Sequence, residues 1–276
     1  MQRYALIGHP IAQSPSPAMH NAAFKHLGID AIYERFEADE HALSKVQTSL
    51  ENPIWSGFNV TTPMKEHVAT LVTLEGHATR AKATNTLFRR DNRWFGYLTD
   101  VEGIVEPLRA RPVQSSGTML IIGSGGATRA AALAGEMLGL SVIIAARRPE
   151  AAHAIIHTLK LNDDCHAVAL DDTTAMHSAL QTASVLVQAT PVGRNNERHD
   201  IPWHALPPHA IAFEMLYAAK PTAFLEDAQH HGLACVEGWE MLLAQGARAF
   251  EIWTQRKAPI EIMRKAMFEN MHNKIL

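Results

Sequence analysis

Short apolar runs alternate with amphipathic stretches along most of the chain. Runs of four to eight apolar residues between turn signals are typical of buried strands, whereas apolar positions spaced three to four apart predict helices. The predicted strands span about residues 3–8, 32–37, 56–61, 83–89, 94–98, 119–122, 141–146, 166–170, 184–189, 210–215 and 233–236. The predicted helices span about residues 17–27, 41–50, 63–72, 75–82, 103–108, 127–138, 149–160, 174–181, 222–231, 240–253 and 260–271. This alternation favours an α/β protein built on parallel sheets.

The stretch from Thr118 to Gly139 gives the clearest local prediction. An apolar strand is followed by the glycine turn Gly123-Ser-Gly-Gly and then by an Ala-rich helix. Glycines in such a turn let backbone N–H groups reach a pyrophosphate at the positive end of the helix, so this order is typical of a dinucleotide-binding βαβ unit. Thr128 stands where a third glycine is usual, and we expect Ala130 and Ala131 to supply the close helix–sheet contact.

Two arginines follow the next predicted strand. A carboxylate at this strand end would bind a ribose 2′-hydroxyl, but the chain has Arg147 and Arg148 there. Guanidinium groups suit a 2′-phosphate, so the sequence favours NADP over NAD. The alternative is a purely structural glycine turn beside two solvated arginines.

Length, composition and charge narrow the class of protein. A chain of 276 residues favours two domains. A net charge of −3 gives no excess of positive charge that would attract nucleic acid. No apolar run approaches the ~20 residues that span a bilayer. We also expect no signal peptide and no disulfide framework from Cys165 and Cys235, as in a reducing cytoplasm. His153 and His157 share a helix face, but no third ligand completes a metal site, so none is predicted.

Several polar residues lie at predicted element ends. Ser14 and Ser16 precede a helix start and could bind a carboxylate, although Ser16 could equally be a simple N-cap. Lys65 lies at a strand–helix junction, where α/β sheets place ligands, although most lysines are solvated surface groups. We expect the predicted hairpin to bring Asn85 and Asp100 close together.

Taken together, these segments resemble the shikimate dehydrogenase family over nearly the whole chain. The motifs that carry the resemblance are GHPIAQSPSPAMHNAAF from Gly8, NVTTPMK from Asn59, ATNTL from Ala83, GYLTDVEG from Gly96, GSGGATRA from Gly123, ATPVG from Ala189, EMLY from Glu214 and GWEMLLAQGARAFEIW from Gly238. The resemblance implies a substrate domain over 1–103, completed by helices of 240–276, and a Rossmann NADP domain over 104–239. It also implies interconversion of 3-dehydroshikimate and shikimate in the cytoplasm, on the route through chorismate to aromatic amino acids.

The resemblance also implies roles for individual residues. Lys65 and Asp100 would be the pair at the reacting C–O bond, titrating as a unit. The substrate carboxylate and ring hydroxyls would contact Ser14, Ser16, Thr61, Asn85, Tyr217 and Gln245. NADP would contact Gly123, Ser124, Gly125, Gly126, Ala127, Arg147, Arg148, Met215 and Gly238.

The chain departs from the family pattern at a few positions. The chain has Gln13 where the family usually has His, Leu98 and Gln188 where it has Asn, and Glu214 where it has Asp. It has Ala146-Arg147-Arg148 where the family usually has Asn-Arg-Thr. None removes a residue assigned to chemistry, although Leu98 bears on the setting of Asp100. A quinate or dual quinate/shikimate dehydrogenase and a catalytically silent NADP-sensing module remain as alternatives, and the protein would be a monomer or a homodimer.

Overall fold

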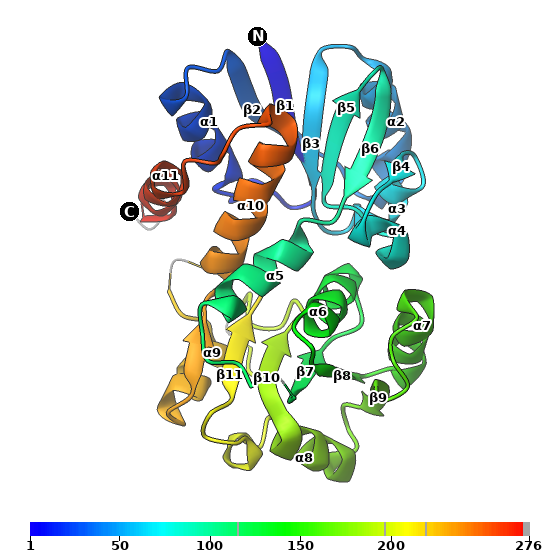
Figure 1. Cartoon of the computed structure of the whole chain (residues 1–276), viewed down its shortest axis with the longest axis vertical. Helices are drawn as coiled ribbons and strands as arrows, with labels where there is room; N and C mark the ends of the chain where they lie inside the picture. Colours follow the sequence, from blue (N-terminus) through cyan, green and yellow to red (C-terminus); the bar gives the residue numbers. More distant parts are fainter. Residues whose placement is uncertain (115, 196, 219, 273–276) are drawn as a thin grey trace. The chain divides into compact units, whose positions relative to one another are not determined.

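The computed structural model of the chain describes residues 1–114, 116–195, 197–218 and 220–272 (Figure 1). Contacts between Cα atoms divide the chain into two compact units. The first unit contains Met1–Thr99 and Gln245–Leu276, and the second contains Asp100–Ala244. Each unit has its own six-stranded sheet with helices packed on it, so the predicted α/β class is confirmed.

The first unit is built on a mixed sheet with the strand order β2-β1-β3-β5-β6-β4. Its strands are β1 (Gln2–Gly8), β2 (Ala31–Glu37), β3 (Trp55–Val60), β4 (Thr73–Leu74), β5 (Thr86–Arg90) and β6 (Arg93–Tyr97). β1 pairs in parallel with β2 and β3, whereas β5 runs antiparallel to β3 and β6. Asp91 and Asn92 turn the β5–β6 hairpin with φ of 51° and 58°, the left-handed conformation that two-residue hairpin loops favour. The carboxyl ends of β1 and β3 and the start of β5 therefore meet at one edge.

Helices from both ends of the chain cover this sheet. They are α1 (Ser16–His26), η1 (Glu40–Ala42), α2 (Leu43–Glu51), α3 (Lys65–Ala69), α4 (His77–Ala81), the later part of α10 (Gly238–Thr254) and α11 (Ile260–His272). One apolar cluster joins Ile7 and Phe58 of the sheet to Val46 and Val68 of the helices. Elsewhere in the unit, Trp253 of α10 lies 4.8 Å from the Tyr4 ring and donates from Nε1 to the Leu87 carbonyl (2.9 Å). The C-terminal helices thus complete the core of the N-terminal unit.

The second unit has a wholly parallel sheet with the strand order β12-β11-β10-β7-β8-β9. Its strands are β7 (Thr118–Ile122), β8 (Ser141–Ala146), β9 (His166–Ala169), β10 (Ala183–Gln188), β11 (Ile211–Glu214) and β12 (Ala234–Val236). Numbered from β7, this is the order 3-2-1-4-5-6 of a dinucleotide-binding fold, in which the strand order reverses between β7 and β10. Ligands in such folds bind at the carboxyl ends of the strands beside that reversal.

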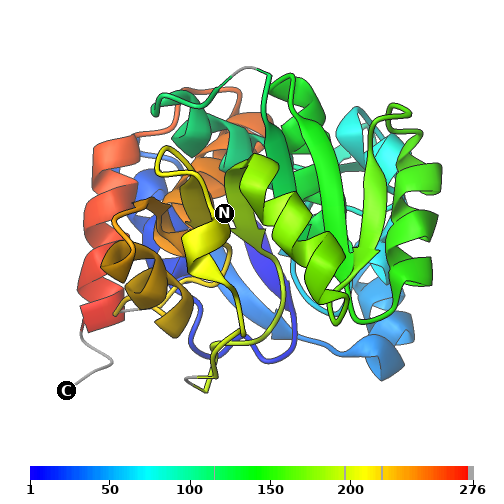
Figure 2. The ribbon, with the colours of Figure 1, turned by 90° about the horizontal axis from the view of Figure 1, so that it is seen from below.

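The helices of the second unit pack on this parallel sheet, except α5, which packs on α6. They are α5 (Asp100–Arg109), α6 (Gly126–Met137), α7 (Pro149–Leu159), α8 (Thr173–Thr182), η2 (Trp203–Ala205) and α9 (Ala223–His230). Figure 2 shows α7 and α8 on either side of the green strands. Ala130 and Ala131 are fully buried, and Gly135, which the sequence analysis did not single out, lies where a Cβ would be 2.8 Å from Val142 Cγ2. A glycine one helical turn later therefore also lets α6 approach the sheet closely.

The structure corrects some of the predicted boundaries. α5 begins at Asp100 and not at Gly103, because Asp100 and Glu102 put negative charge in its first turn, where the helix dipole favours it. The helix predicted to reach Val72 ends at Ala69, and the short strand β4 follows it, which the sequence analysis missed. η2 was also missed.

The units meet along the chain at residues 99/100 and 244/245. The first part of α10, up to Ala244, belongs to the second unit. There Arg111 donates from Nη2 to both Glu240 carboxylate oxygens (2.8 and 3.1 Å). The remainder of α10 belongs to the first unit. One continuous helix is therefore shared between the two units.

Candidate active site

Two buried serines lie at the start of α1. Ser14 and Ser16 are 2% and 4% exposed, and the Ser14 hydroxyl donates to that of Ser16 (3.1 Å). Ser16 is the first helical residue and not the N-cap, which is Pro15, and its backbone N–H donates to Ser14 Oγ (3.3 Å). Arg35 of β2 donates to the carbonyls of Ile11 and Ser14 and so fixes the loop. Two hydroxyls at an uncapped helix start are suited to a carboxylate.

A buried polar network surrounds Asn85, the residue before β5. Asn85 Nδ2 donates to Thr99 Oγ1 (2.9 Å) and to Gln245 Oε1 (3.1 Å), and its Oδ1 accepts from the Thr99 backbone N–H (2.6 Å). Asn85, Thr99 and Gln245 are between 0% and 8% exposed. The network thus joins the end of the β5–β6 hairpin to α10. It also fixes the backbone at Thr99, directly before Asp100, while Leu98 is buried in the core.

A second layer of residues supports this network, and the sequence analysis did not assign it. Tyr33 of β2 donates from its hydroxyl to Asn59 Oδ1 (2.8 Å), and Asn59 Nδ2 donates to Thr86 Oγ1 (3.0 Å) and to the Asn85 carbonyl (3.2 Å). The His20 ring stacks on Tyr33 at 4.5 Å. Burial lowers the pKa of His20 to about 3, so its ring is neutral. Asn59 within an otherwise apolar strand was the one available signal, since a buried amide needs partners.

Lys65 and Thr61 follow β3 at the same edge of the first sheet. Thr61 is half-buried and donates its backbone N–H to the Ile7 carbonyl of β1 (2.8 Å). Lys65 is also half-buried and is the first residue of α3, and its carbonyl accepts from the Thr84 backbone N–H (3.1 Å). Asp100, in the second unit, is 4% exposed and is the first residue of α5. Both residues therefore begin helices, α3 two residues after its predicted start and α5 three residues before its predicted start.

The glycine turn after β7 has the form that a pyrophosphate site needs. Gly123 has φ of +128°, and a Cβ there would lie 2.9 Å from the Ala189 carbonyl oxygen after β10. Nothing lies within 4 Å of a Cβ placed on Gly125, which is the N-cap of α6 and supplies no capping side chain. The N–H groups of Gly126 and Ala127, the first two of α6, are therefore available to an anion in an open space.

The two arginines lie at the end of the neighbouring strand. β8 ends at Ala146, and Arg147 and Arg148 follow it with exposed side chains, Arg148 being the N-cap of α7. Because β7 and β8 are adjacent and parallel, these guanidinium groups follow the strand next to the glycine turn. The residues present fit an NADP molecule whose pyrophosphate lies on α6.

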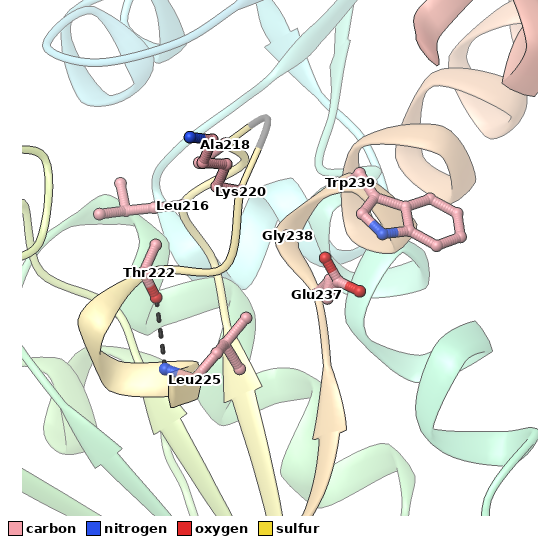
Figure 3. Close-up of a pocket in the computed structure, with 8 residues that line it drawn as sticks. All are labelled: Leu216, Ala218, Lys220, Thr222, Leu225, Glu237, Gly238 and Trp239. Atoms are coloured by element: carbon pink, nitrogen blue, oxygen red, sulfur yellow. Dashed lines mark hydrogen bonds between the residues drawn. The ribbon is translucent and has the colours of Figure 1, made fainter. Parts of the chain in front are cut away.

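The segment after β11 carries two further predicted ligand contacts. Met215 is half-buried and Tyr217 is 40% exposed. Gly238 begins α10 beside this segment, where a Cβ would lie 2.2 Å from the Leu216 carbonyl oxygen. The recess here, drawn in Figure 3, has a volume of about 10 Å³, which suits one water molecule and no ring.

Two buried polar side chains shape the ends of β10 and β11. Gln188 donates to the carbonyls of Thr190 and Val192 (3.3 and 2.6 Å) and accepts from the Thr190 backbone N–H (2.8 Å). Glu214, opposite Gln188 in the sheet register, is 0% exposed. Burial raises the pKa of Glu214 to about 7 against three hydrogen bonds that lower it. Gln188 and Glu214, the two departures from the family pattern, thus hydrogen-bond to the loops that follow their own strands.

Two other kinds of site are absent from the described part of the chain. Among the residues that the structure describes, no group of three or more His, Cys, Asp or Glu side chains could hold a metal ion. Within the same residues, no helix is both long and apolar enough to cross a bilayer.

Family models match both ends of the chain. A model described as the shikimate dehydrogenase substrate binding domain matches residues 6–87. A second, described as the shikimate 5'-dehydrogenase C-terminal domain, matches residues 238–268. The two matched regions contain the serines at α1, Asn85 and α10 with Gln245.

Known proteins resemble the chain over nearly its full length. Shikimate dehydrogenase (NADP(+)) of Archaeoglobus fulgidus is 36% identical over 266 residues, covering 95% of this chain and 96% of that protein. The protein of the same name from Dehalococcoides mccartyi is 37% identical over 270 residues, covering 95% and 93%. A crystal structure of shikimate 5-dehydrogenase from Thermus thermophilus, in complex with NADP(H) and shikimate, is 33% identical with a TM-score of 0.86 and covers 98% of this chain and 100% of that one.

Proposed function

Because the chain belongs to the shikimate dehydrogenase family, we propose that it catalyses the reversible, NADPH-dependent reduction of 3-dehydroshikimate to shikimate. The protein is thus an oxidoreductase acting on a CH–OH group, in the pathway that leads through chorismate to aromatic amino acids. The first unit would bind the substrate and the second NADP.

One observation carries the proposal. Residues that the family pattern assigns to the substrate, including Ser14, Asn85 and Gln245, are buried polar side chains around one edge of the first unit's sheet. Burying so many hydroxyl and amide groups costs stability unless they are hydrogen-bonded, and a catalytically silent module would have no need of them. A small polyhydroxylated carboxylic acid supplies matching groups: a carboxylate for the two serines and hydroxyls for Thr61, Asn85 and Gln245.

The reduction requires a hydride at the carbonyl carbon and a proton at its oxygen. NADPH supplies the hydride when it is bound. In the proposed assignment the Lys65 ammonium stabilises the negative charge that develops on the carbonyl oxygen and delivers the proton. Asp100 accepts a hydrogen bond from the same hydroxyl in the reverse direction and orients Lys65.

The cofactor assignment rests on the carboxyl edge of the second sheet. Gly123, Ser124, Gly125, Gly126 and Ala127 would line the pyrophosphate, and the backbone N–H groups of Gly126 and Ala127 at the start of α6 would donate to it. Met215 and Gly238 would contact the nicotinamide end. Tyr217, on the same segment as Met215, would contact the substrate carboxylate.

Arg147 and Arg148 would bind the 2′-phosphate and so distinguish NADP from NAD. Their side chains are exposed at the end of β8, where a charged fork can meet an anion without the cost of burial. A dehydrogenase that acts on quinate, or on both compounds, remains the second candidate, because quinate carries the same carboxylate and ring hydroxyls.

Steady-state rates with shikimate and quinate, each with NADP and with NAD, test the proposal. We expect turnover with shikimate and NADP to exceed the other three combinations. Faster turnover of quinate with NAD would favour the second candidate, and no turnover with any pair would favour an NADP-sensing module.

The setting of the enzyme is also proposed. Cys165 and Cys235 are free thiols, which fits a cytoplasmic enzyme that draws on a reduced nicotinamide pool. The enzyme would be a monomer or a homodimer, and light scattering of the purified protein distinguishes the two.

A further inference from the structure

Glu214 joins two points of the chain that lie on either side of an irregular segment. Its Oε1 accepts a hydrogen bond from the Leu216 backbone N–H (2.9 Å), and its Oε2 accepts one from the Thr222 hydroxyl (2.7 Å). The side chain is 0% exposed, so water does not compete for these bonds. The carboxyl group therefore holds both ends of the segment that leads from β11 to α9.

Thr222 relays this contact into α9. It is the N-cap of that helix, and its Oγ1 accepts from the Leu225 backbone N–H, the bond drawn in Figure 3. On the other side, Gly238 lies against the Leu216 backbone so closely that no Cβ would fit. Movement of the Leu216 end would therefore disturb the contact with Gly238, and movement of the Thr222 end would uncap α9.

We propose that Glu214 is a positioning residue, whose carboxyl group holds Met215 and Tyr217 in the conformation that meets the cofactor and the substrate. This inference rests on the proposed function, in which these two side chains lie on one short segment and contact different ligands. Loss of the Glu214 hydrogen bonds should therefore lower the affinity of the enzyme for both ligands together. No residue that contacts only one ligand would do so.

The bonds, and not the charge, carry this role. A protonated carboxyl, or the amide of glutamine, can accept from the Leu216 N–H with one atom and donate to Thr222 Oγ1 with the other. Titratable groups on the neighbouring elements include Lys220, His199, Arg198, Glu226, Asp227, His230, Cys235 and Glu237. Arg198 pairs with Glu226 and Asp227, and His199 Nε2 lies 3.3 Å from Thr190 Oγ1.

The test compares two pairs of variants in the full-length enzyme. Glu214→Leu removes both bonds at similar size, whereas Glu214→Gln keeps both. Thr222→Val removes the hydroxyl at the same size, whereas Thr222→Ser keeps it. We expect the Leu and Val variants to raise the Michaelis constants for NADPH and for 3-dehydroshikimate together, by about tenfold, the upper end of the scale for one net hydrogen bond between neutral groups. The Gln and Ser variants should stay within about twofold of the wild type.

A merely structural role predicts a different result. Partial misfolding lowers the concentration of active enzyme, so turnover falls and both Michaelis constants stay constant. That result would overturn the proposal. So would a change in the Michaelis constant for only one of the two ligands, or a Glu214→Gln variant as impaired as Glu214→Leu. If Glu214→Leu fails to fold, the Thr222 pair decides. A wild-type enzyme that is inactive on 3-dehydroshikimate would refute the proposed function instead. NADPH binding, followed by fluorescence, would still show whether the Glu214 hydrogen bonds position the segment.

Discussion

Replacing Glu214 by Gln should change how the stability of the protein depends on pH. The pKa of this buried carboxyl is raised from its ordinary 4.5 to about 7, with burial as the largest cause. Between these two pH values the unfolded chain is ionised at this residue while the folded chain keeps its proton. The folded state therefore binds more protons, and its stability must fall as the pH rises through this window.

The size of the effect follows from the same values. Each tenfold change in proton affinity corresponds to about 1.4 kcal/mol. A rise of the pKa from 4.5 to about 7 thus costs the wild type roughly 3 kcal/mol between pH 4.5 and neutrality, and nothing more above it. Glutamine keeps the hydrogen bonds and does not titrate, so the variant should gain roughly this amount relative to the wild type as the pH rises.

Urea denaturation of both proteins at pH values of about 5, 6, 7 and 8, followed by circular dichroism, measures this difference across the window in which the carboxyl titrates. The quantity to compare is the free energy of unfolding of the variant minus that of the wild type. All other titrating groups contribute equally to both proteins and cancel. If this difference is the same at the two ends of the pH range, Glu214 titrates normally in the folded protein and the reasoning from its burial is wrong.

Three other changes have distinct expected outcomes. Lys65→Ala should lower kcat by ~10²-fold or more while the Michaelis constant for shikimate moves little, because its interaction forms mainly in the transition state; Ser14→Ala should do the reverse. Replacing Arg147 and Arg148 by Ala should raise the Michaelis constant for NADP far more than that for NAD, since only NADP carries the 2′-phosphate. His20→Leu should weaken the loss of stability in acid, measured by urea denaturation. The His20 pKa lies near 3 in the folded protein and near 6.5 when unfolded, so its stabilising effect is lost as the pH falls through that range.

Each of these predictions has an opposing result. Near-normal turnover with weakened substrate affinity would make Lys65 a binding residue. An equal rise in the Michaelis constants for NADP and NAD would show that Arg147 and Arg148 do not determine the choice between the two cofactors. A His20→Leu variant that loses stability in acid as steeply as the wild type would show that other groups dominate acid unfolding.

The sequence was informative where a local pattern has one structural solution. Apolar runs and helical periodicity predicted the strand and helix sequence, and the glycines after residue 122 predicted the turn at α6. The sequence is less informative about where a helix begins. It predicts that α1 begins at Pro17 and α5 at Gly103, whereas these helices start at Ser16 and Asp100. Helix ends depend on hydrogen bonds of single residues, which periodicity does not report.

The supporting residues could not be predicted, because their partners are distant in the sequence. Tyr33 bonds to Asn59, and Asn85 bonds to Gln245, which lies 160 residues away. Glu214 and Gln188 were visible only as departures from a pattern. What each departure does depends on which backbone groups the fold brings within reach of the side chain.

The sharing of α10 between the units has a consequence for the order in which a newly made chain can fold. The second unit is one continuous segment, Asp100–Ala244, whereas the first needs Gln245 onward to cover Tyr4, Leu87 and the rest of its core. A ribosome releases the N-terminal strands long before Trp253 is made, so these strands must wait with an uncovered apolar face while the middle of the chain is synthesised. We expect the nucleotide unit to fold first during translation, although it is encoded second. Nascent chains that end between Ala244 and Trp253 should then resist protease in their middle and remain sensitive at their N-terminus.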